Sequence, residues 1–416
     1  MVLETTDRQP VHVVYGGAQL FKAETPARLG ELALELVRNY TPDASSLAEC
    51  LGLSGELAQS VFERTVAKLE REPVEDFRID FEDGYGYRSD SEEDGHAVST
   101  AQLLARGAAK PRFPPFCGVR IKPFTQALGA RAARTLDLFL TALVEESGGL
   151  PRNFAITLPK ITSPGQVSEL VALLDQAESR HGLESGAIKI ELMIETPQTI
   201  IDSSGTFAIP KLLEAANGRC RGLHFGPYDY SASCNIAAAE QRLDHPACDF
   251  ARHVIQVCAA DRGVFLSDGP STILPIPRHR TPTTEEQRAE NRAVVRRAMR
   301  HHFDLVQRSL THGYYQGWDL HPGQLPTRYA AVYAFFLKSL DSAVARLRNF
   351  IEKAAQATLV GDVFDDAATG QGLLNFLLRG VNCGAITEEE AAASGLTIEE
   401  LRGRSFIKIM ENRRKP

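Results

Sequence analysis

Short β-rich runs alternate with longer helical patterns along most of the 416-residue chain, and this alternation limits the possible folds more than any other feature. Between the runs, apolar residues recur at helical spacing, as in Pro26–Asn39 and Ala130–Glu146. Strands alternating with helices predict a parallel sheet, and eight of them predict an α/β fold closed into a (β/α)8 TIM barrel. The expected strands are Val11–Tyr15, Phe77–Phe81, Cys117–Lys122, Phe154–Pro159, Ala187–Ile194, Gly222–Phe225, Val264–Ser267 and Gly317–His321.

The C-terminal part of the chain has a different pattern. After the last expected strand the apolar spacing is helical throughout, and we expect no strand there. The sequence therefore predicts a barrel domain at residues 1–328 and an all-helical C-terminal cap at residues 329–416. Within the barrel, the polar stretch Gly84–Gly95 is expected to be a loop that leads into a helix at His96–Ala109.

Composition excludes several classes of protein. A hydrophobic share of 43% and a charged share of 24% are typical of a soluble globular protein. The net charge is -7 and the basic residues are dispersed, so a nucleic-acid partner is not expected. Met1 to Pro10 form no apolar segment, and neither a secretory signal nor a membrane span is expected. Seven cysteines without a Cys-x-x-Cys pair indicate a reducing cytoplasm.

Charged residues stand where several of the expected strands end. Asp80 and Glu82 close the second strand, Arg120 ends the third, Glu195 follows the fifth and Asp229 comes after the sixth. Barrel enzymes carry their reacting groups at this end of the strands, so the side chains are expected to share one site. Taken singly, Glu195 before a Thr-Pro pair is also typical of a helix start, and Asp229 of a turn.

Five short motifs carry a family resemblance. Their order along the chain is similar to that in the superfamily of HpcH/HpaI aldolases, citrate lyase beta subunits and malate synthases, in which a magnesium ion stabilises an enolate. The last motif most resembles the C-terminal region of malate synthases, where an aspartate removes a proton. The motifs are Ile79-Asp80-Phe81-Glu82-Asp83, Val119-Arg120-Ile121, Met193-Ile194-Glu195-Thr196, Phe225-Gly226-Pro227-Tyr228-Asp229-Tyr230 and Phe364-Asp365-Asp366-Ala367-Ala368-Thr369.

The resemblance implies a magnesium centre. Glu195 and Asp229 would be the metal ligands, since Mg²⁺ prefers a few hard carboxylates and keeps water and substrate at its other positions. Arg120 would bind a carboxylate or a developing oxyanion. Glu82, and with it Asp80, would hold metal-bound waters or the arginine in place. A solvated loop start is the alternative for these two acids.

The Phe225-Gly226-Pro227-Tyr228 segment is expected to bind the substrate. Backbone N–H groups around Gly226 and Tyr228 would bind a carboxylate beside the metal. Pro227 departs from the family pattern and removes one N–H donor. Lys122 would lie on the same side of its strand as Arg120, and its role stays open.

Asp366 is the expected base. The resemblance aligns it with the family aspartate, with Asp365 as the competitor. A carboxylate in this role would take a proton from the methyl group of a thioester while the metal and Arg120 absorb the charge. The alternative for Asp366 is the N-cap of a helix that starts near Ala367, and the two roles are compatible.

The leading hypothesis is a Mg²⁺-dependent Claisen-type lyase or synthase that acts on a small 2-oxo or hydroxy acid with an acyl-CoA partner. We expect a cytoplasmic homo-oligomer, and the cap would close either its own barrel or a neighbour's. A class II pyruvate-type aldolase ranks second, because Asp80-Phe-Glu-Asp83 offers no histidine base. A non-catalytic homologue that binds a metal or metabolite is the alternative from another class.

Overall fold

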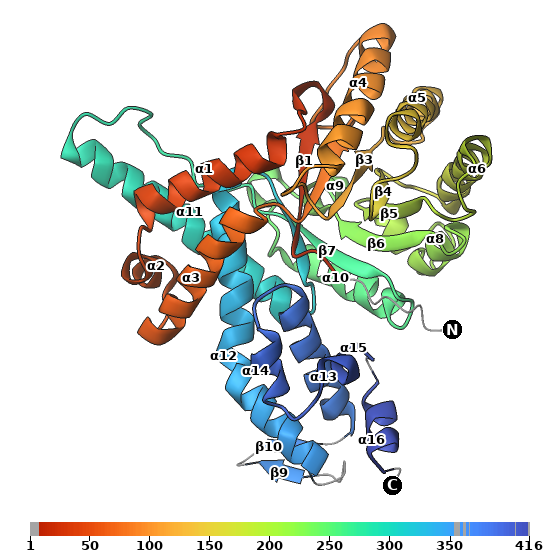
Figure 1. Ribbon diagram of the computed structural model, residues 1–416. Helices are drawn as coiled ribbons and strands as arrows, with labels where there is room; N and C mark the ends of the chain where they lie inside the picture. The colour runs from red at the N-terminus through yellow and green to blue at the C-terminus, as the bar shows by residue number, and fades with distance from the viewer. Residues whose placement is uncertain (1–7, 353–357, 361–362, 366, 404, 415–416) are drawn as a thin grey trace.

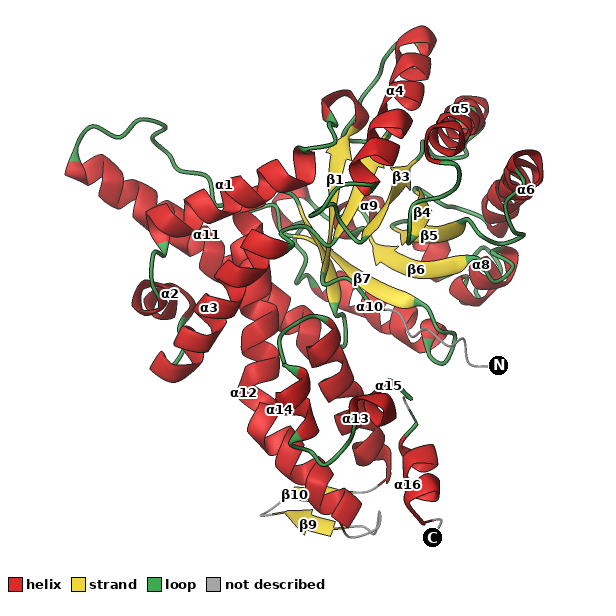
Figure 2. Ribbon diagram, viewed as in Figure 1, coloured by secondary structure: helices red, strands yellow, loops and turns green. Residues whose placement is uncertain are grey.

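The computed structural model describes residues 8–352, 358–360, 363–365, 367–403 and 405–414. Eight parallel strands close into a barrel in chain order, and β8 pairs back onto β1 through Gly317 and His12. Helices surround the barrel, and the C-terminal helices gather to one side of it (Figures 1 and 2). The strands are β1 (His12–Gly17), β2 (Asp76–Asp80), β3 (Phe116–Arg120), β4 (Phe154–Leu158), β5 (Lys189–Ile194), β6 (Cys220–Phe225), β7 (Phe265–Pro270) and β8 (Gln316–Asp319).

The predicted barrel is confirmed, with each strand within a few residues of its expected position. Strands β2, β3 and β4 are buried at every residue, because helices cover their outer face and side chains fill the barrel on the inner face. The surrounding helices are α1 (Thr25–Tyr40), α2 (Ala44–Leu51), α3 (Gly55–Arg71), α4 (Asp90–Ala108), α5 (Gly129–Ser147), α6 (Pro164–His181), α7 (Pro197–Ile200), α8 (Ile209–Ala215), α9 (Pro227–Ser233), α10 (Pro246–Ala259) and α11 (Glu285–Thr311).

The barrel interior is charged as well as apolar. Arg78 of β2 donates to Glu191 of β5 with Nη2 and Oε1 2.7 Å apart, and these strands are not neighbours, so the bond crosses the interior. Arg221 of β6 donates to the same Oε1 at 2.9 Å, and Arg78 also pairs with Asp76. Each buried charge therefore has an opposite partner, as burial of ions requires.

The expected loop at Gly84–Gly95 is wrong in its second half. Helix α4 begins at Asp90, six residues before the expected start at His96. Ser89 caps it by accepting a hydrogen bond from the backbone N–H of Glu92 at 3.3 Å. Acidic residues in the first turn, favourable at a helix N-terminus, make this polar stretch helical.

The C-terminal part is mainly helical, as predicted, but the expectation of no strand is wrong. Strands β9 and β10 pair antiparallel, with Val360 opposite Val363. Their β-branched residues favour extended chain, and the intervening sequence Gly361-Asp362 is a dipeptide typical of hairpins. The elements are α12 (Leu325–Glu352), β9 (Thr358–Val360), β10 (Val363–Asp365), α13 (Ala367–Asn382), α14 (Glu388–Ala392), α15 (Ile398–Arg402) and α16 (Phe406–Arg414).

Helix α13 lies at the amino ends of the barrel strands. It packs on α12 and lines a cavity of about 540 Å³. The other walls of this cavity include Val11, just before β1, Phe265, the first residue of β7, and Tyr315, just before β8. The predicted boundary between residues 328 and 329 falls inside α12, and a division into two domains stays a prediction.

None of the seven cysteines, all of which are described, forms a disulfide. Over the described ranges, no helix combines the length and the apolar character needed to cross a membrane.

Candidate active site

The charged residues predicted at the strand ends meet at the carboxyl end of the barrel. Direct contacts connect the end of β2 with the end of β3, and one lysine after β4 contacts acids from the segments after β2 and after β5 and from α9. Barrel closure therefore creates one polar cluster from five consecutive strand ends. The predicted members of the cluster are Asp80, Glu82, Arg120, Glu195 and Asp229.

Arg120 is held in place by Asp80, the last residue of β2, and by Glu82 just after it. Its Nε lies 2.7 Å from Oδ1 of Asp80 and its Nη2 lies 2.5 Å from Oδ2, so the carboxylate is held at both oxygens. Its Nη1 lies 3.1 Å from Oε2 of Glu82. Asp80 also accepts the backbone N–H groups of Glu82 and Gly84, at 2.9 and 2.8 Å. Burial and this pairing pre-orient the guanidinium, which is the geometry needed to bind an anion in one fixed position.

Two aromatic rings form the floor below Arg120. Its guanidinium carbon lies 4.7 Å from the ring centroid of Tyr15 on β1 and 5.3 Å from that of Trp318 on β8. The Tyr15 hydroxyl lies 3.2 Å from Nδ1 of His224 on β6. Sequence reasoning missed these residues. The alternation of inward and outward side chains along a strand could have indicated them, since Tyr15 and Trp318 occupy strand positions that point into the barrel.

Lys160, directly after β4, was also missed as a site residue. Its ammonium pairs with Glu82, lies 3.1 Å from Oδ2 of Asp83 and lies 3.7 Å from Oδ2 of Asp229. Burial would lower the pKa of this lysine, but the carboxylates of Glu195 and Glu82 outweigh burial and hold the pKa above its ordinary value. Its position after the end of β4, like that of Arg120 at the end of β3, could have indicated a role in the site.

Glu195 is the most strongly perturbed acid of the cluster. It is 2% exposed and accepts the backbone N–H of Lys160 at 2.6 Å. Burial raises its pKa to about 7 against the opposing charge of Lys160, and the negative charges of Asp229 and Glu82 add to the rise. The cluster is therefore short of positive charge, a condition that a bound cation would relieve.

The donor set fits a magnesium ion. The charge of Asp80 balances that of Arg120. The remaining carboxylates share a single ammonium group, that of Lys160; they belong to Glu82, Asp83, Glu195 and Asp229. Within the part of the chain that the structure describes, no group of three or more His, Cys, Asp or Glu is placed to hold a metal. Mg²⁺ tolerates as few as two protein carboxylates because it keeps waters and binds substrate oxygens. Glu195 and Asp229 are suitable as that pair.

Gly226 allows the backbone to approach Glu195. A Cβ atom at this position would lie 2.5 Å from Cβ of Glu195 and 2.6 Å from its Oε2, so a larger residue would displace the carboxylate. The expected role of the Gly226 N–H as a substrate donor does not fit, because it donates to the carbonyl of Ile194 at 3.0 Å. Tyr228 stands in the first turn of α9, and its hydroxyl donates to the carbonyl of Pro270 at 2.9 Å.

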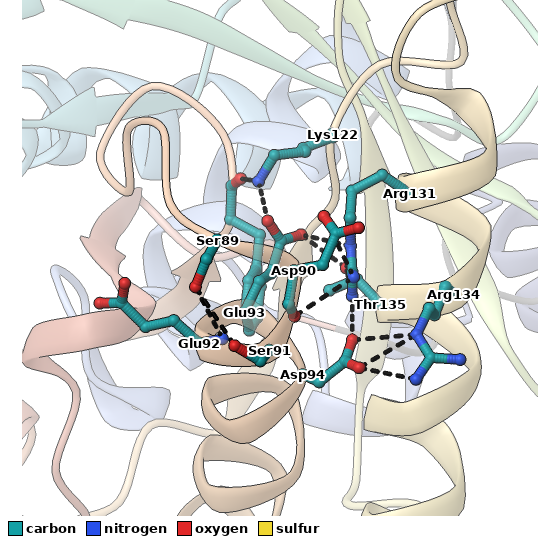
Figure 3. A network of polar contacts seen from close by, with 11 residues as sticks. Ser89, Asp90, Ser91, Glu92, Glu93, Asp94, Lys122, Arg131, Arg134 and Thr135 are labelled. Carbon is teal, nitrogen blue, oxygen red and sulfur yellow. Dashed lines mark hydrogen bonds and ion pairs between the residues drawn. The ribbon is translucent and has the colours of Figure 1, made fainter.

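The ammonium of Lys122 is bound to other parts of the fold. Its ammonium donates to Oε2 of Glu93 on α4 at 2.7 Å and to the carbonyl of Phe81 at 2.9 Å. Figure 3 shows Glu93 within a network that also joins Arg131 and Thr135 of α5. Lys122 therefore ties the end of β3 to two helices, which answers the question that the sequence left open.

Asp366, the expected base, lies outside the described residues. The helix that follows it, α13, lies at the amino ends of the barrel strands, whereas Glu195 and Asp229 lie at the carboxyl ends. Within one chain, α13 and the charged cluster are thus at opposite ends of the barrel.

Solved structures with a similar fold include a citrate lyase from Burkholderia xenovorans LB400, with a TM-score of 0.60 and 20% identity over 94% of this chain and 97% of that one. A second is CitE from Mycobacterium tuberculosis in complex with magnesium, acetoacetate and coenzyme A, with a TM-score of 0.50 and 14% identity over 91% and 99% of the two chains. A Haloferax volcanii malate synthase in complex with magnesium and glyoxylate has a TM-score of 0.47 and 15% identity over 97% and 92%.

The first two likenesses confirm, at the level of the fold, the resemblance that the motifs indicate. No curated protein matches the chain. A family model described as "Domain of unknown function (DUF6986)" matches residues 3–409, and the chain therefore belongs to this family.

Proposed function

We propose that the protein is a magnesium-dependent carbon–carbon lyase or synthase of Claisen type. Its substrate would be a small 2-oxo or hydroxy acid, and its partner an acyl-CoA. The observation that carries this proposal is the buried Glu195 and the half-exposed Asp229, which share the neighbour Lys160, beside an arginine that two acids hold in place. The fold shared with citrate lyase and CitE, the latter bound to magnesium, acetoacetate and coenzyme A, supports it.

Each residue of the cluster would have a distinct role. Glu195 and Asp229 would hold Mg²⁺, which would supply positive charge for an enolate oxygen and orient the acid. Arg120 would present Nη1 to a substrate oxygen in place of Sδ of Met193, a weak acceptor at 3.7 Å, while the same nitrogen keeps its contact with Oε2 of Glu82 at 3.1 Å. Asp80 and Glu82 would keep the guanidinium in position without themselves contacting the reacting carbon.

The proton would be taken by Asp366 of another copy of the chain. Helix α13 lies at the amino ends of its own barrel strands and the charged cluster lies at the carboxyl ends, which supports a contribution from a neighbouring subunit. This arrangement makes the predicted homo-oligomer a requirement for activity. It also suggests a complementation test: E195Q and D366N, each inactive alone, should recover activity when their subunits are mixed. Mixed oligomers without activity would contradict the arrangement.

Deuterium exchange tests the chemistry itself. Exchange from solvent into the methyl groups of acetyl-CoA and of pyruvate would be followed by NMR, with and without Mg²⁺ and a panel of 2-oxo acids. Exchange into acetyl-CoA that requires Mg²⁺ is the expected result. Exchange into pyruvate alone would make the protein a pyruvate-type aldolase. Mg²⁺ binding with no exchange into either compound would make it a binding protein.

A further inference from the structure

Lys160 occupies the centre of the charged cluster. Its ammonium pairs with Glu82 and lies 3.1 Å from Asp83 and 3.7 Å from Asp229. These acids come from the segment after β2 and from α9, so one cation connects two sides of the barrel mouth. Asp229 is also one of the two proposed metal ligands.

The backbone around Lys160 is fixed, whereas its side chain has room to move. The residue has a φ of 49°, in the left-handed region, and its N–H donates to Oε1 of Glu195 at 2.6 Å. Next to it, Ile161 accepts a hydrogen bond from the Thr196 hydroxyl at 2.6 Å. The side chain is 31% exposed, and its four-carbon stem can swing towards solvent without disturbing these bonds.

An ammonium and a magnesium ion compete for the same oxygens. Both attract hard carboxylates, but the ammonium brings one charge and directional N–H bonds, whereas Mg²⁺ brings two charges and an octahedral shell. Two cations a few ångströms apart in a partly buried site repel each other. A divalent ion that bound Glu195 and Asp229 would therefore displace the ammonium from Asp229.

We propose that Lys160 is a built-in counter-ion that holds the metal ligands together before the metal arrives and lowers the affinity of the site for Mg²⁺. This inference rests on the proposed function, because it takes Glu195 and Asp229 as the ligands. Lys160 is thus a positioning residue that acts through the acids around it. It keeps the cluster compact in the metal-free protein and moves aside when Mg²⁺ binds.

Calorimetric titration of the EDTA-treated full-length protein with MgCl₂ tests the inference. K160M removes the charge and keeps most of the stem, and it should bind Mg²⁺ at least about tenfold more tightly than the wild type. K160R keeps the charge and should bind weakly. K110M is the matched control, since Lys110 pairs with Glu24 at the surface and lies at the amino end of β3, so it should match the wild type.

Thermal unfolding gives a second readout. Without metal, K160M should melt below the wild type, because its carboxylates lose their counter-ion, and Mg²⁺ should raise its melting temperature more than it raises that of the wild type. If K160M fails to fold, K160Q takes its place. Equal or weaker Mg²⁺ binding by the neutral variants would overturn the inference while leaving the metal site intact. Absence of Mg²⁺ binding in every variant and in the wild type would instead overturn the proposed function and, with it, this inference.

Discussion

The buried pair of Asp80 and Arg120 allows a quantitative test through Asp80→Asn. The asparagine keeps the size of the side chain and an oxygen for one of the backbone N–H groups that Asp80 now accepts. It removes the charge that two nitrogens of Arg120 face. The two side chains are 1% and 2% exposed, so water cannot replace the lost partner. Among the described acids, Glu82 at 3.1 Å remains to offset the guanidinium.

The size of the effect follows from these contacts. Removing one partner of a buried ion pair costs about 3–5 kcal/mol, and the remaining contact with Glu82 places Asp80→Asn near the lower end. Unfolding entropy of about 2.1 cal/mol/K per residue amounts to about 0.9 kcal/mol/K for 416 residues. If the whole chain unfolds in one transition, a loss of about 3 kcal/mol lowers the melting temperature by about 3 to 4 °C.

Circular dichroism melting in EDTA would measure this shift. D83N is the control, because Asp83 is 60% exposed and its pair with Lys160 is worth less than about 1 kcal/mol, or about 1 °C. The double variant D80N/R120M should melt above D80N, since it contains no unpaired buried charge. A D80N protein that melts within about 1 °C of the wild type would refute the reasoning.

Three further predictions concern the metal ligands and the base. Because burial raises the pKa of Glu195 from 4.5 to about 7, the folded state binds a proton there more tightly than the unfolded chain. The metal-free protein should therefore lose stability as the pH rises from 4.5 to about 7, and its affinity for Mg²⁺ should fall below pH 7. An E195Q variant whose melting temperature kept the same pH dependence would contradict this assignment. G226A should weaken Mg²⁺ binding at least about tenfold, because its new Cβ would displace Glu195. G222A is the control, since its new Cβ would lie at an ordinary 3.4 Å from the nearest atom, and calorimetry should show Mg²⁺ affinity reduced in G226A alone. D366N should abolish methyl deuterium exchange with little change in Mg²⁺ affinity; loss of metal binding would argue against a role as base.

The barrel was predictable because its strands are short, buried runs between amphipathic helices. The positions of Asp80, Arg120 and Glu195 were predictable for the same reason, since each follows directly from where a strand ends. Element boundaries were less certain. The start of α4 depends on the Ser89 cap, and a cap competes with loop conformations that the same polar residues also favour.

Contacts across the barrel were not predictable from local sequence. Tyr15 and Trp318 meet Arg120 only because β8 closes onto β1. Lys160 was missed because a lysine after a strand is ordinarily a surface residue, and its acidic partners come from distant segments. The position of α13 at the amino end of the barrel depends on how α12 packs, which local spacing does not encode.

The charged barrel interior has a consequence for how this family can vary. Arg78 is shared by Asp76 and Glu191, and Arg221 depends on Glu191 as well. Loss of one member leaves a buried charge without a partner, whereas exchange of a whole pair for well-packed apolar residues is often tolerated. Substitutions at these positions should therefore be correlated among homologous sequences, with arginine and acid gained or lost together.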